Sequence, residues 1–153
     1  MRKILVVCVG NICRSPVAEA MFKVKLPNID VQSAGMSAML GHSADPMAAQ
    51  IALANGIDIS AHRGRQLASW MLQDADLVLV METNHQKQLS QQYPLSRGKI
   101  RCLGEFDAPG DFGAAGTVDI ADPYRQSEQA FLLSHERISR GVAAWVSRIV
   151  QLT

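Results

Sequence analysis

The chain lacks the long apolar runs, the strong charge and the clustered cysteines that would assign it to several common classes of protein. None of its apolar runs is long enough to span a bilayer, and its N-terminal segment has the pattern of a strand, which differs from that of a signal peptide. The formal net charge is only +1 and the basic residues are dispersed, so we expect no nucleic-acid partner and no membrane insertion. Its three cysteines have no metal-ligand spacing, which predicts no metal site.

Two nucleotide-binding motifs are also missing, because the sequence has neither a dinucleotide fingerprint nor a lysine-bearing phosphate loop. An α/β fold here therefore does not predict NAD or ATP, and we expect no cofactor. The chain shows no linker, no internal repeat and no low-complexity stretch, and 48% of its residues are hydrophobic. Its 153 residues suit one compact domain, which we expect to span residues 1–153.

Apolar strand patterns alternate with helical patterns along the chain. This alternation predicts an α/β fold, a single-domain four-stranded parallel sheet with helices on both faces. In such a sheet the ligand site lies at the carboxyl ends of strands where the connections diverge. The patterns predict strands over 3–7, 29–34, 77–81 and 99–103, helices starting at 16 and over 46–55, 66–72, 83–92 and 127–151, and a glycine-rich loop over 105–121.

The most informative segment is residues 6–16, Val-Val-Cys-Val-Gly-Asn-Ile-Cys-Arg-Ser-Pro, which joins the first strand to the first helix. Pro16 suits the first turn of that helix. The helix N-terminus attracts anions, because its first N–H groups have no partner within the helix and the peptide dipoles place positive charge there. Gly10 and Asn11 tolerate the positive φ that a tight anion-binding loop needs.

Cys8 and Arg14 give this loop its chemistry. The helix N-terminus, the Arg14 guanidinium and the Ser15 hydroxyl would each stabilise a thiolate at Cys8, which would then be nucleophilic at neutral pH. Arg14 can offer a planar pair of donors to two phosphate oxygens. Together these residues predict a phosphoryl-transfer pocket in which sulfur attacks phosphorus and forms a phosphocysteine. Without that context, Cys8 also fits the end of a buried strand.

The segment 7–16 resembles the signature loop of the low-molecular-weight protein tyrosine phosphatases. Residues 33–35, 44–46 and 119–124, and His62 with its neighbouring arginines, match the same family in order and approximate spacing. The resemblance covers essentially the whole chain. It implies an enzyme that hydrolyses phosphotyrosine through a phosphocysteine intermediate, without metal or cofactor, and that binds phosphate or vanadate.

The resemblance also implies roles for the residues of the site. It makes Cys8 the nucleophile, Arg14 the phosphate-binding cation, and Asp122 the general acid that later serves as the base. Asp119 is the rival carboxylate, and an Asp-Pro-Tyr sequence by itself is most often a turn. The phosphate-binding residues would be Val9, Gly10, Asn11, Ile12, Cys13, Arg14 and Ser15.

Three polar residues are expected to support the loop. From the resemblance, Asn11, Ser33 and His62 form a network that holds the loop in shape and positions Ser15, although His62 alone would also fit an ordinary surface position. In this family the second loop cysteine, here Cys13, can form a disulfide with the nucleophile under peroxide, which makes the enzyme redox-sensitive. Cys13 otherwise fits an apolar packing position, and Cys102 in the fourth strand fits the core.

Substrate recognition needs apolar or aromatic walls around the phosphotyrosine ring. Met39, Leu40 and Tyr124 could supply them. The aliphatic segment 36–41 and the Asp-Pro-Tyr-Arg sequence resemble bacterial members of the family linked to capsule or exopolysaccharide production. That resemblance implies a tyrosine autokinase as the phosphorylated partner. A thiolate mechanism needs a reducing environment, so we expect a cytoplasmic protein.

Two alternatives remain at this stage. An arsenate reductase shares the fold and the nucleophile loop, but it needs further cysteines on a mobile segment, and the sequence has none between Ala61 and Ile100. A non-catalytic phosphotyrosine-binding module would keep Arg14 and the loop amides, but it would have no use for Cys8 or Asp122. A thioredoxin-coupled arsenate assay tests the reductase. Turnover of a small aryl phosphate, lost in Cys8→Ser while phosphate affinity remains, separates an enzyme from the binding module.

Overall fold

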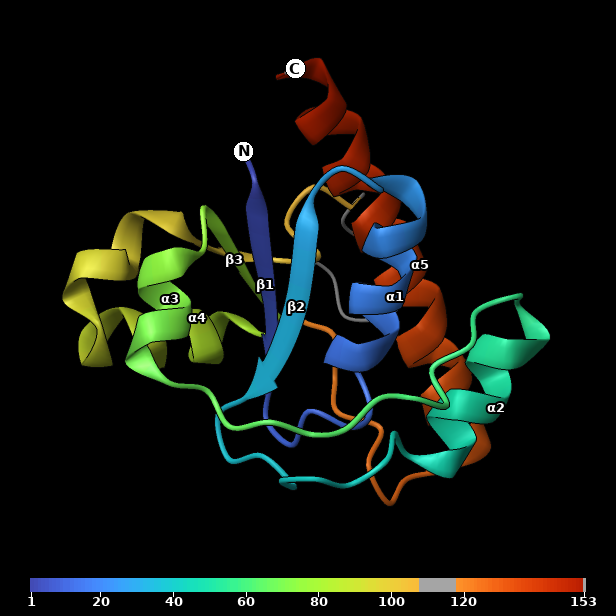
Figure 1. Ribbon diagram of the computed structural model, residues 1–153. Coiled ribbons are helices and arrows are strands. Elements are labelled where there is room, and N and C mark those ends of the chain that lie inside the picture. The colour runs from blue at the N-terminus through green and yellow to red at the C-terminus, as the bar shows by residue number, and fades with distance from the viewer. Residues whose placement is uncertain (108–117, 153) are drawn as a thin grey trace.

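A four-stranded parallel sheet lies between two layers of helices in the computed structural model, which describes residues 1–107 and 118–152 (Figure 1). The strand order is β2-β1-β3-β4, and α1, α2 and α5 lie on the opposite side of the sheet from α3 and α4. This arrangement confirms the predicted α/β class. The elements are β1 (Lys3–Cys8), α1 (Ser15–Lys25), β2 (Asp30–Gly35), α2 (Pro46–Ala54), α3 (Ser69–Asp74), β3 (Leu77–Val80), α4 (Thr83–Gln92), a 3-10 helix η1 (Pro94–Lys99), β4 (Ile100–Cys102) and α5 (Glu128–Gln151).

The central strand β1 is apolar and buried from Ile4 to Cys8 because both of its faces are covered. Ile4, Val6 and Cys8 belong to the core beneath α1 and α5, whereas Leu5 and Val7 belong to the core on the side of α3 and α4. Successive side chains of a strand point to opposite faces, so a strand between two helix layers needs apolar residues at every position. This explains the uninterrupted run before the loop.

Helix α5 closes one face of the sheet. Ser127 caps its start by accepting a hydrogen bond from the N–H of Ala130 at 3.2 Å. Trp145 ties the helix to β4, since its indole Nε1 donates to the carbonyl of Cys102 at 3.1 Å. Within residues 1–107 and 118–152, neither α5 nor a shorter helix is apolar enough over a sufficient length to cross a membrane. The buried face of α5 carries Phe131, Ile138, Val142, Trp145 and Ile149, as its periodicity predicts.

Two predicted segments differ from the observed ones, and a third lies partly outside the described residues. The helix predicted over 66–72 begins three residues later, because Gln66 forms a bridge with Gly35 and extends the sheet edge. The strand predicted over 99–103 is shorter, since residues 94–99 form η1. Of the glycine-rich loop predicted over 105–121, residues 108–117 lie outside the described part of the chain.

The sheet order places the divergence of the connections beside β1. After β1 the chain crosses to β2 on one side, and after β2 it returns to β3 on the other side of β1. In open α/β sheets this divergence opens a crevice at the carboxyl ends of the two strands. Cys8 ends β1, and Glu82 follows β3 by two residues, so both lie at this edge.

The end of β2 is closely packed against the segment that follows Cys8. A Cβ added at Gly35 would lie 2.5 Å from the carbonyl oxygen of Val9 and 3.1 Å from Ala38. We therefore expect Gly35→Ala to lower the free energy of unfolding by about 1–3 kcal/mol, as overpacking does. Gly98→Ala is the matched control, because nothing lies within 4 Å of its added Cβ. Urea denaturation of both variants tests this, and equal midpoints would contradict it.

Candidate active site

The segment between β1 and α1 folds around the sulfur of Cys8. The backbone N–H of Asn11 points at Cys8 Sγ at 3.3 Å, and the Ser15 hydroxyl oxygen lies 2.9 Å from the same sulfur. Cys8 is 2% exposed. The sulfur therefore lies at the base of a loop that offers it a backbone N–H and a hydroxyl next to the N-terminus of α1. Both groups stabilise a negatively charged sulfur.

Asn11 holds this loop in shape. Its φ is +59°, in the left-handed region that asparagine tolerates better than most residues. Its side-chain amide donates to the hydroxyl of Ser15 at 2.7 Å and to that of Ser33 at 3.0 Å, while its Oδ1 accepts from the N–H of Arg65 at 2.9 Å. Because Ser15 accepts from Asn11, its own hydroxyl proton is available to the sulfur of Cys8.

Two further residues complete the network around Asn11. The Nε2 of His62 lies 2.6 Å from the backbone carbonyl oxygen of Asn11. The hydroxyl of Ser33 donates to the carboxylate of Glu19 on α1. The structure thus brings together the three polar residues expected to support the loop, and it adds Glu19, which the sequence analysis did not identify.

Arg14 is almost completely buried, with 1% of its surface exposed. Its NH1 donates to the carboxylate of Glu82 at 2.7 Å and to the carbonyl of Ile120 at 2.7 Å, and its NH2 lies 3.7 Å from the Asp122 carboxylate. Among the described residues its Nε has no hydrogen-bond partner, although it is buried. A buried donor without a partner costs free energy unless a ligand accepts from it. The Nε of Arg14 is therefore suited to a bound oxyanion.

Glu82 is a second residue of the site that the sequence analysis missed. It lies at the carboxyl end of β3, as Cys8 lies at the end of β1, and this shared edge is the signal that could have identified it. Its carboxylate also lies 3.4 Å from Nε2 of His85. Burial lowers the pKa of His85, although Glu82 acts in the opposite direction. Because a neutral His85 forms no ion pair with Glu82, the carboxylate of Glu82 pairs with the guanidinium of Arg14.

The two candidate acids have different surroundings. The side chain of Asp122 is 43% exposed, and its Oδ1 accepts from the N–H of Tyr124 at 3.1 Å. Asp119 instead accepts from the N–H of Thr83 at 2.7 Å, at the start of α4. Asp122 lines the cavity over Cys8, whereas Asp119 is not among the described residues that line it. The geometry favours Asp122 as the acid that faces a substrate.

A cavity of about 190 Å³ opens over Cys8. Its wall includes Met39 and Tyr124, and the Arg125 guanidinium stacks 5.3 Å from the centre of the Tyr124 ring. Leu40, also expected at this wall, is 69% exposed and is not among the described residues that line the cavity. The lining residues are Cys8, Val9, Gly10, Ile12, Cys13, Arg14, Ser37, Met39, Asp122 and Tyr124. Of the predicted phosphate-binding residues, Asn11 and Ser15 lie behind this lining, both fully buried.

The other two cysteines are buried thiols. Burial raises the pKa of the Cys13 thiol far above its usual range, and it raises that of Cys102 to about 11. Cys102 lies in β4, where its thiol contacts the side-chain oxygen of Gln86 at 3.7 Å. In the part of the chain that the structure describes, no three His, Cys, Asp or Glu side chains are grouped to hold a metal ion.

Comparison with known proteins gives concordant matches over the whole site. The sequence model of the family "Low molecular weight phosphotyrosine protein phosphatase" matches residues 3–152. A curated relative from Ralstonia nicotianae, the probable low molecular weight protein-tyrosine-phosphatase EpsP, is 44% identical over 149 residues, which are 97% of each chain.

Solved structures also match over nearly the whole chain. The tyrosine phosphatase AmsI of Erwinia amylovora superposes with a TM-score of 0.88 at 37% identity, over 96% of this chain and 92% of that one. Vibrio vulnificus Wzb, solved in complex with benzylphosphonate, superposes with a TM-score of 0.86 at 41% identity, over 96% and 98% of the two chains.

Proposed function

The chain belongs to the low molecular weight phosphotyrosine protein phosphatase family, and we propose that Cys8, Arg14 and Asp122 carry out its reaction, the hydrolysis of phosphotyrosine in proteins. The observation that carries this assignment is that all three side chains line one cavity of about 190 Å³. Residues 1–153 act as one catalytic domain.

In the first step the sulfur of Cys8 attacks the phosphorus of phosphotyrosine. The new S–P bond forms while the bond from phosphorus to the tyrosine oxygen breaks. The loop N–H groups and the Nε and NH2 of Arg14 bind the remaining phosphate oxygens, because NH1 is already held by Glu82 and Ile120. Asp122 donates its proton to the leaving tyrosine oxygen. The products of this step are a dephosphorylated tyrosine side chain on the substrate protein and a phosphocysteine at Cys8.

In the second step water hydrolyses the phosphocysteine. Asp122, now ionised, accepts a proton from the water as its oxygen attacks phosphorus. The S–P bond breaks, Cys8 leaves as a thiolate and inorganic phosphate is released. The Ser15 hydroxyl, 2.9 Å from the sulfur, donates to this thiolate as charge returns to it.

The alternatives fit these residues less well. A reductase of the same fold would need a mobile cysteine to receive a disulfide, whereas Cys102 is buried in β4. A module that only binds phosphotyrosine would have no use for an acid 3.7 Å from Arg14. Both the position of Asp122 and the exposure of its carboxylate to the cavity favour turnover.

The physiological substrate is a phosphorylated tyrosine autokinase of capsule or exopolysaccharide production, and the protein acts in the cytoplasm. The relatives named EpsP and Wzb, both low molecular weight protein-tyrosine-phosphatases, support the link to exopolysaccharide production. Met39 and Tyr124, which both line the cavity over Cys8, support a phosphotyrosine side chain as the group bound there, since such walls suit a flat aromatic ring.

The decisive measurement is kcat/KM on a phosphotyrosine peptide and on the same peptide carrying phosphoserine or phosphoarginine. We expect hydrolysis of phosphotyrosine at a rate at least 10² times that of the others, with persistence in strong chelator. Cys8→Ser should abolish turnover but retain phosphate binding, because Arg14 and the loop N–H groups remain. Hydrolysis by Cys8→Ser at the normal rate would overturn the mechanism.

The role of Asp122 predicts a dependence on the leaving group. Asp122→Ala should lower kcat by roughly 10²–10⁴ for phenyl phosphates whose leaving group has a high pKa, and much less for activated ones, because only the former need a proton. Asp119→Ala is the control, and it should show no such dependence. An equal loss for both kinds of substrate in Asp122→Ala would contradict the assignment.

Cys13 gives the site a reversible response to oxidation. It lines the same cavity as Cys8, and we expect mild peroxide to oxidise Cys8 to a sulfenic acid, which then condenses with the Cys13 thiol to a disulfide and releases water. Peptide mapping should find this link, and dithiothreitol should restore activity. In Cys13→Ser, oxidation should be irreversible. Recovery of wild-type Cys8 only as sulfinic or sulfonic acid would exclude the link.

A further inference from the structure

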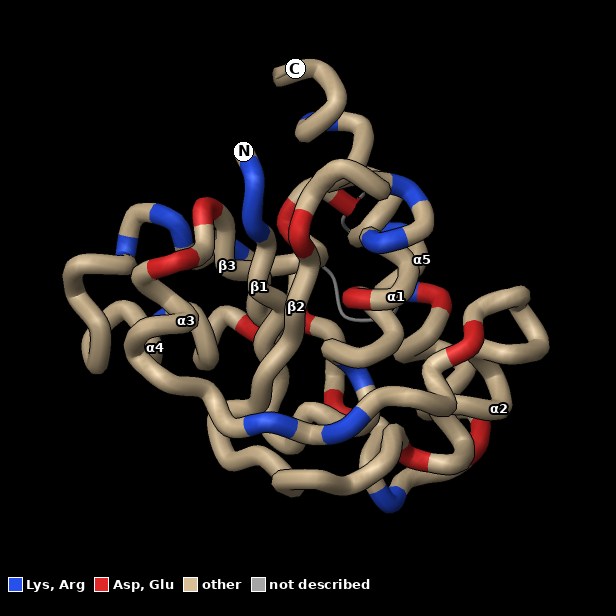
Figure 2. The backbone as a smooth tube through the Cα atoms, in the orientation of Figure 1, with Lys and Arg blue, Asp and Glu red and all other residues tan. Residues whose placement is uncertain are grey.

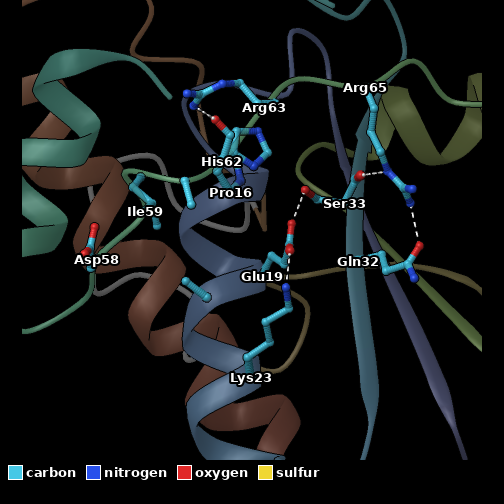
Figure 3. A pocket seen from close by; sticks show the side chains of 12 residues that line it. Pro16, Glu19, Lys23, Gln32, Ser33, Asp58, Ile59, His62, Arg63 and Arg65 are labelled. Carbon is cyan, nitrogen blue, oxygen red and sulfur yellow. Dashed lines mark hydrogen bonds and ion pairs between the residues drawn. The ribbon is translucent and has the colours of Figure 1, made fainter. Parts of the chain in front are cut away.

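A second cavity, of about 410 Å³, lies between α1, β2 and the segment 58–65 (Figure 3). It is about twice as large as the cavity over Cys8, and no described residue lines both. Figure 3 shows Glu19 on α1 between Lys23 and Ser33, with His62 and the two arginines of the neighbouring segment above them. The proposed reaction uses none of this space.

Basic side chains outnumber acidic ones by one among the residues that line this cavity. Lys23, Arg63 and Arg65 line it, against two carboxylates, Glu19 and Asp58. Lys23 is paired with Glu19 at 2.6 Å. In Figure 2 the blue positions on the segment between α2 and α3 correspond to Arg63 and Arg65, the basic residues of that segment. Beyond this ion pair the cavity holds two guanidinium groups and one carboxylate, that of Asp58.

Neither arginine is bound to a carboxylate among the described residues. Arg63 donates only to carbonyl oxygens of its own segment, those of Ser60 at 3.3 Å and His62 at 2.7 Å. Arg65 donates to the carbonyl of Ser33 at 2.9 Å and to the side-chain oxygen of Gln32 at 2.6 Å. Their positive charge is therefore uncompensated by hydrogen-bonded anions.

We propose that this cavity binds a small organic dicarboxylate or tricarboxylate, and that its occupation weakens binding of the phosphoester at Cys8. A guanidinium presents coplanar N–H groups that match the coplanar oxygens of a carboxylate. Pro16, Ala20 and Ile59 give the cavity an apolar wall for the carbon chain of such a ligand. The proposed coupling to Cys8 rests on the function assigned above.

The coupling follows from contacts that end on Asn11. The Nε2 of His62 lies 2.6 Å from the carbonyl oxygen of Asn11, and the backbone N–H of Arg65 donates to the Oδ1 of Asn11 at 2.9 Å. The hydroxyl of Ser33 accepts from the side-chain amide of Asn11 at 3.0 Å. All three of these residues line the second cavity. A bound anion would draw Lys23 and the arginines toward itself and add negative charge behind the loop, which disfavours a second anion at Cys8.

Binding is tested by titrating the isotope-labelled protein with succinate and with citrate, using sulfate and acetate as comparison anions. We expect saturable amide shifts centred on Lys23, Arg63 and Arg65. Saturating benzylphosphonate, which should occupy the cavity over Cys8, should raise the apparent Kd of citrate no more than about fivefold. Complete displacement of citrate by benzylphosphonate, or equal affinity for sulfate, would overturn the proposal.

Matched variants locate the site. Arg63→Gln should weaken citrate binding at least about tenfold, because it removes a charged donor. Arg97→Gln, which changes another exposed arginine outside the cavity, should leave it unchanged. Lys23→Gln and Lys25→Gln form a second pair on α1, of which only the first residue lines the cavity. Equal effects within either pair would show that binding is not at this cavity.

The coupling is tested by turnover of a small aryl phosphate. Citrate should lower kcat/KM about two- to fivefold and then reach a plateau, and the effect should be lost in Arg63→Gln. Inhibition that proceeds to completion would place citrate at Cys8, and unchanged kcat/KM with intact binding would overturn the coupling. If the unliganded protein showed no turnover, the proposed reaction would fail, while the titration would still decide whether the cavity binds.

Discussion

The left-handed backbone of Asn11 is the constraint on which the active-site loop depends. A non-glycine residue in this region costs of order 1–3 kcal/mol unless its surroundings hold it there. Here its side chain bonds to Ser15, Ser33 and the N–H of Arg65, and its carbonyl lies 2.6 Å from His62. These bonds hold the loop open around the sulfur before any ligand arrives. The loop N–H groups then need no reorganisation when charge develops on a phosphate.

The buried Arg14 answers a second constraint, since a cation removed from water must be paired or bound to a ligand. Glu82 and the carbonyl of Ile120 hold one end of its guanidinium at 2.7 Å each. The other end is left for an oxyanion, which makes the pocket attractive to a dianion. Because Glu82 lies at the end of β3 and Arg14 follows the β1 loop, this ion pair also joins the two strands at which the connections diverge.

The sequence was sufficient to predict the class of fold, because the strands and helices carry strong periodic patterns and both sheet faces are covered. It also located the loop, since a strand, a Gly-Asn pair and Pro16 at a helix start lie close together in the chain. Glu82 and Glu19 were missed because their partners, Arg14 and Ser33, lie far away in sequence. Leu40 was expected at the substrate wall because the aliphatic segment does not reveal which of its side chains faces inward.

Met39, which lines the cavity together with Tyr124, is fixed to the loop itself. Its N–H donates to the carbonyl of Gly10 at 3.0 Å, and a Cβ added at Gly64 would lie 2.3 Å from its carbonyl oxygen. The segment that carries His62 and Arg65 is thus packed against the wall as well as bonded to Asn11. A change in this segment therefore acts on the phosphate-binding loop and on the substrate wall together, because the segment contacts both. Substrate preference can therefore change through the side chains that project from the wall, while the backbone that binds phosphate stays fixed.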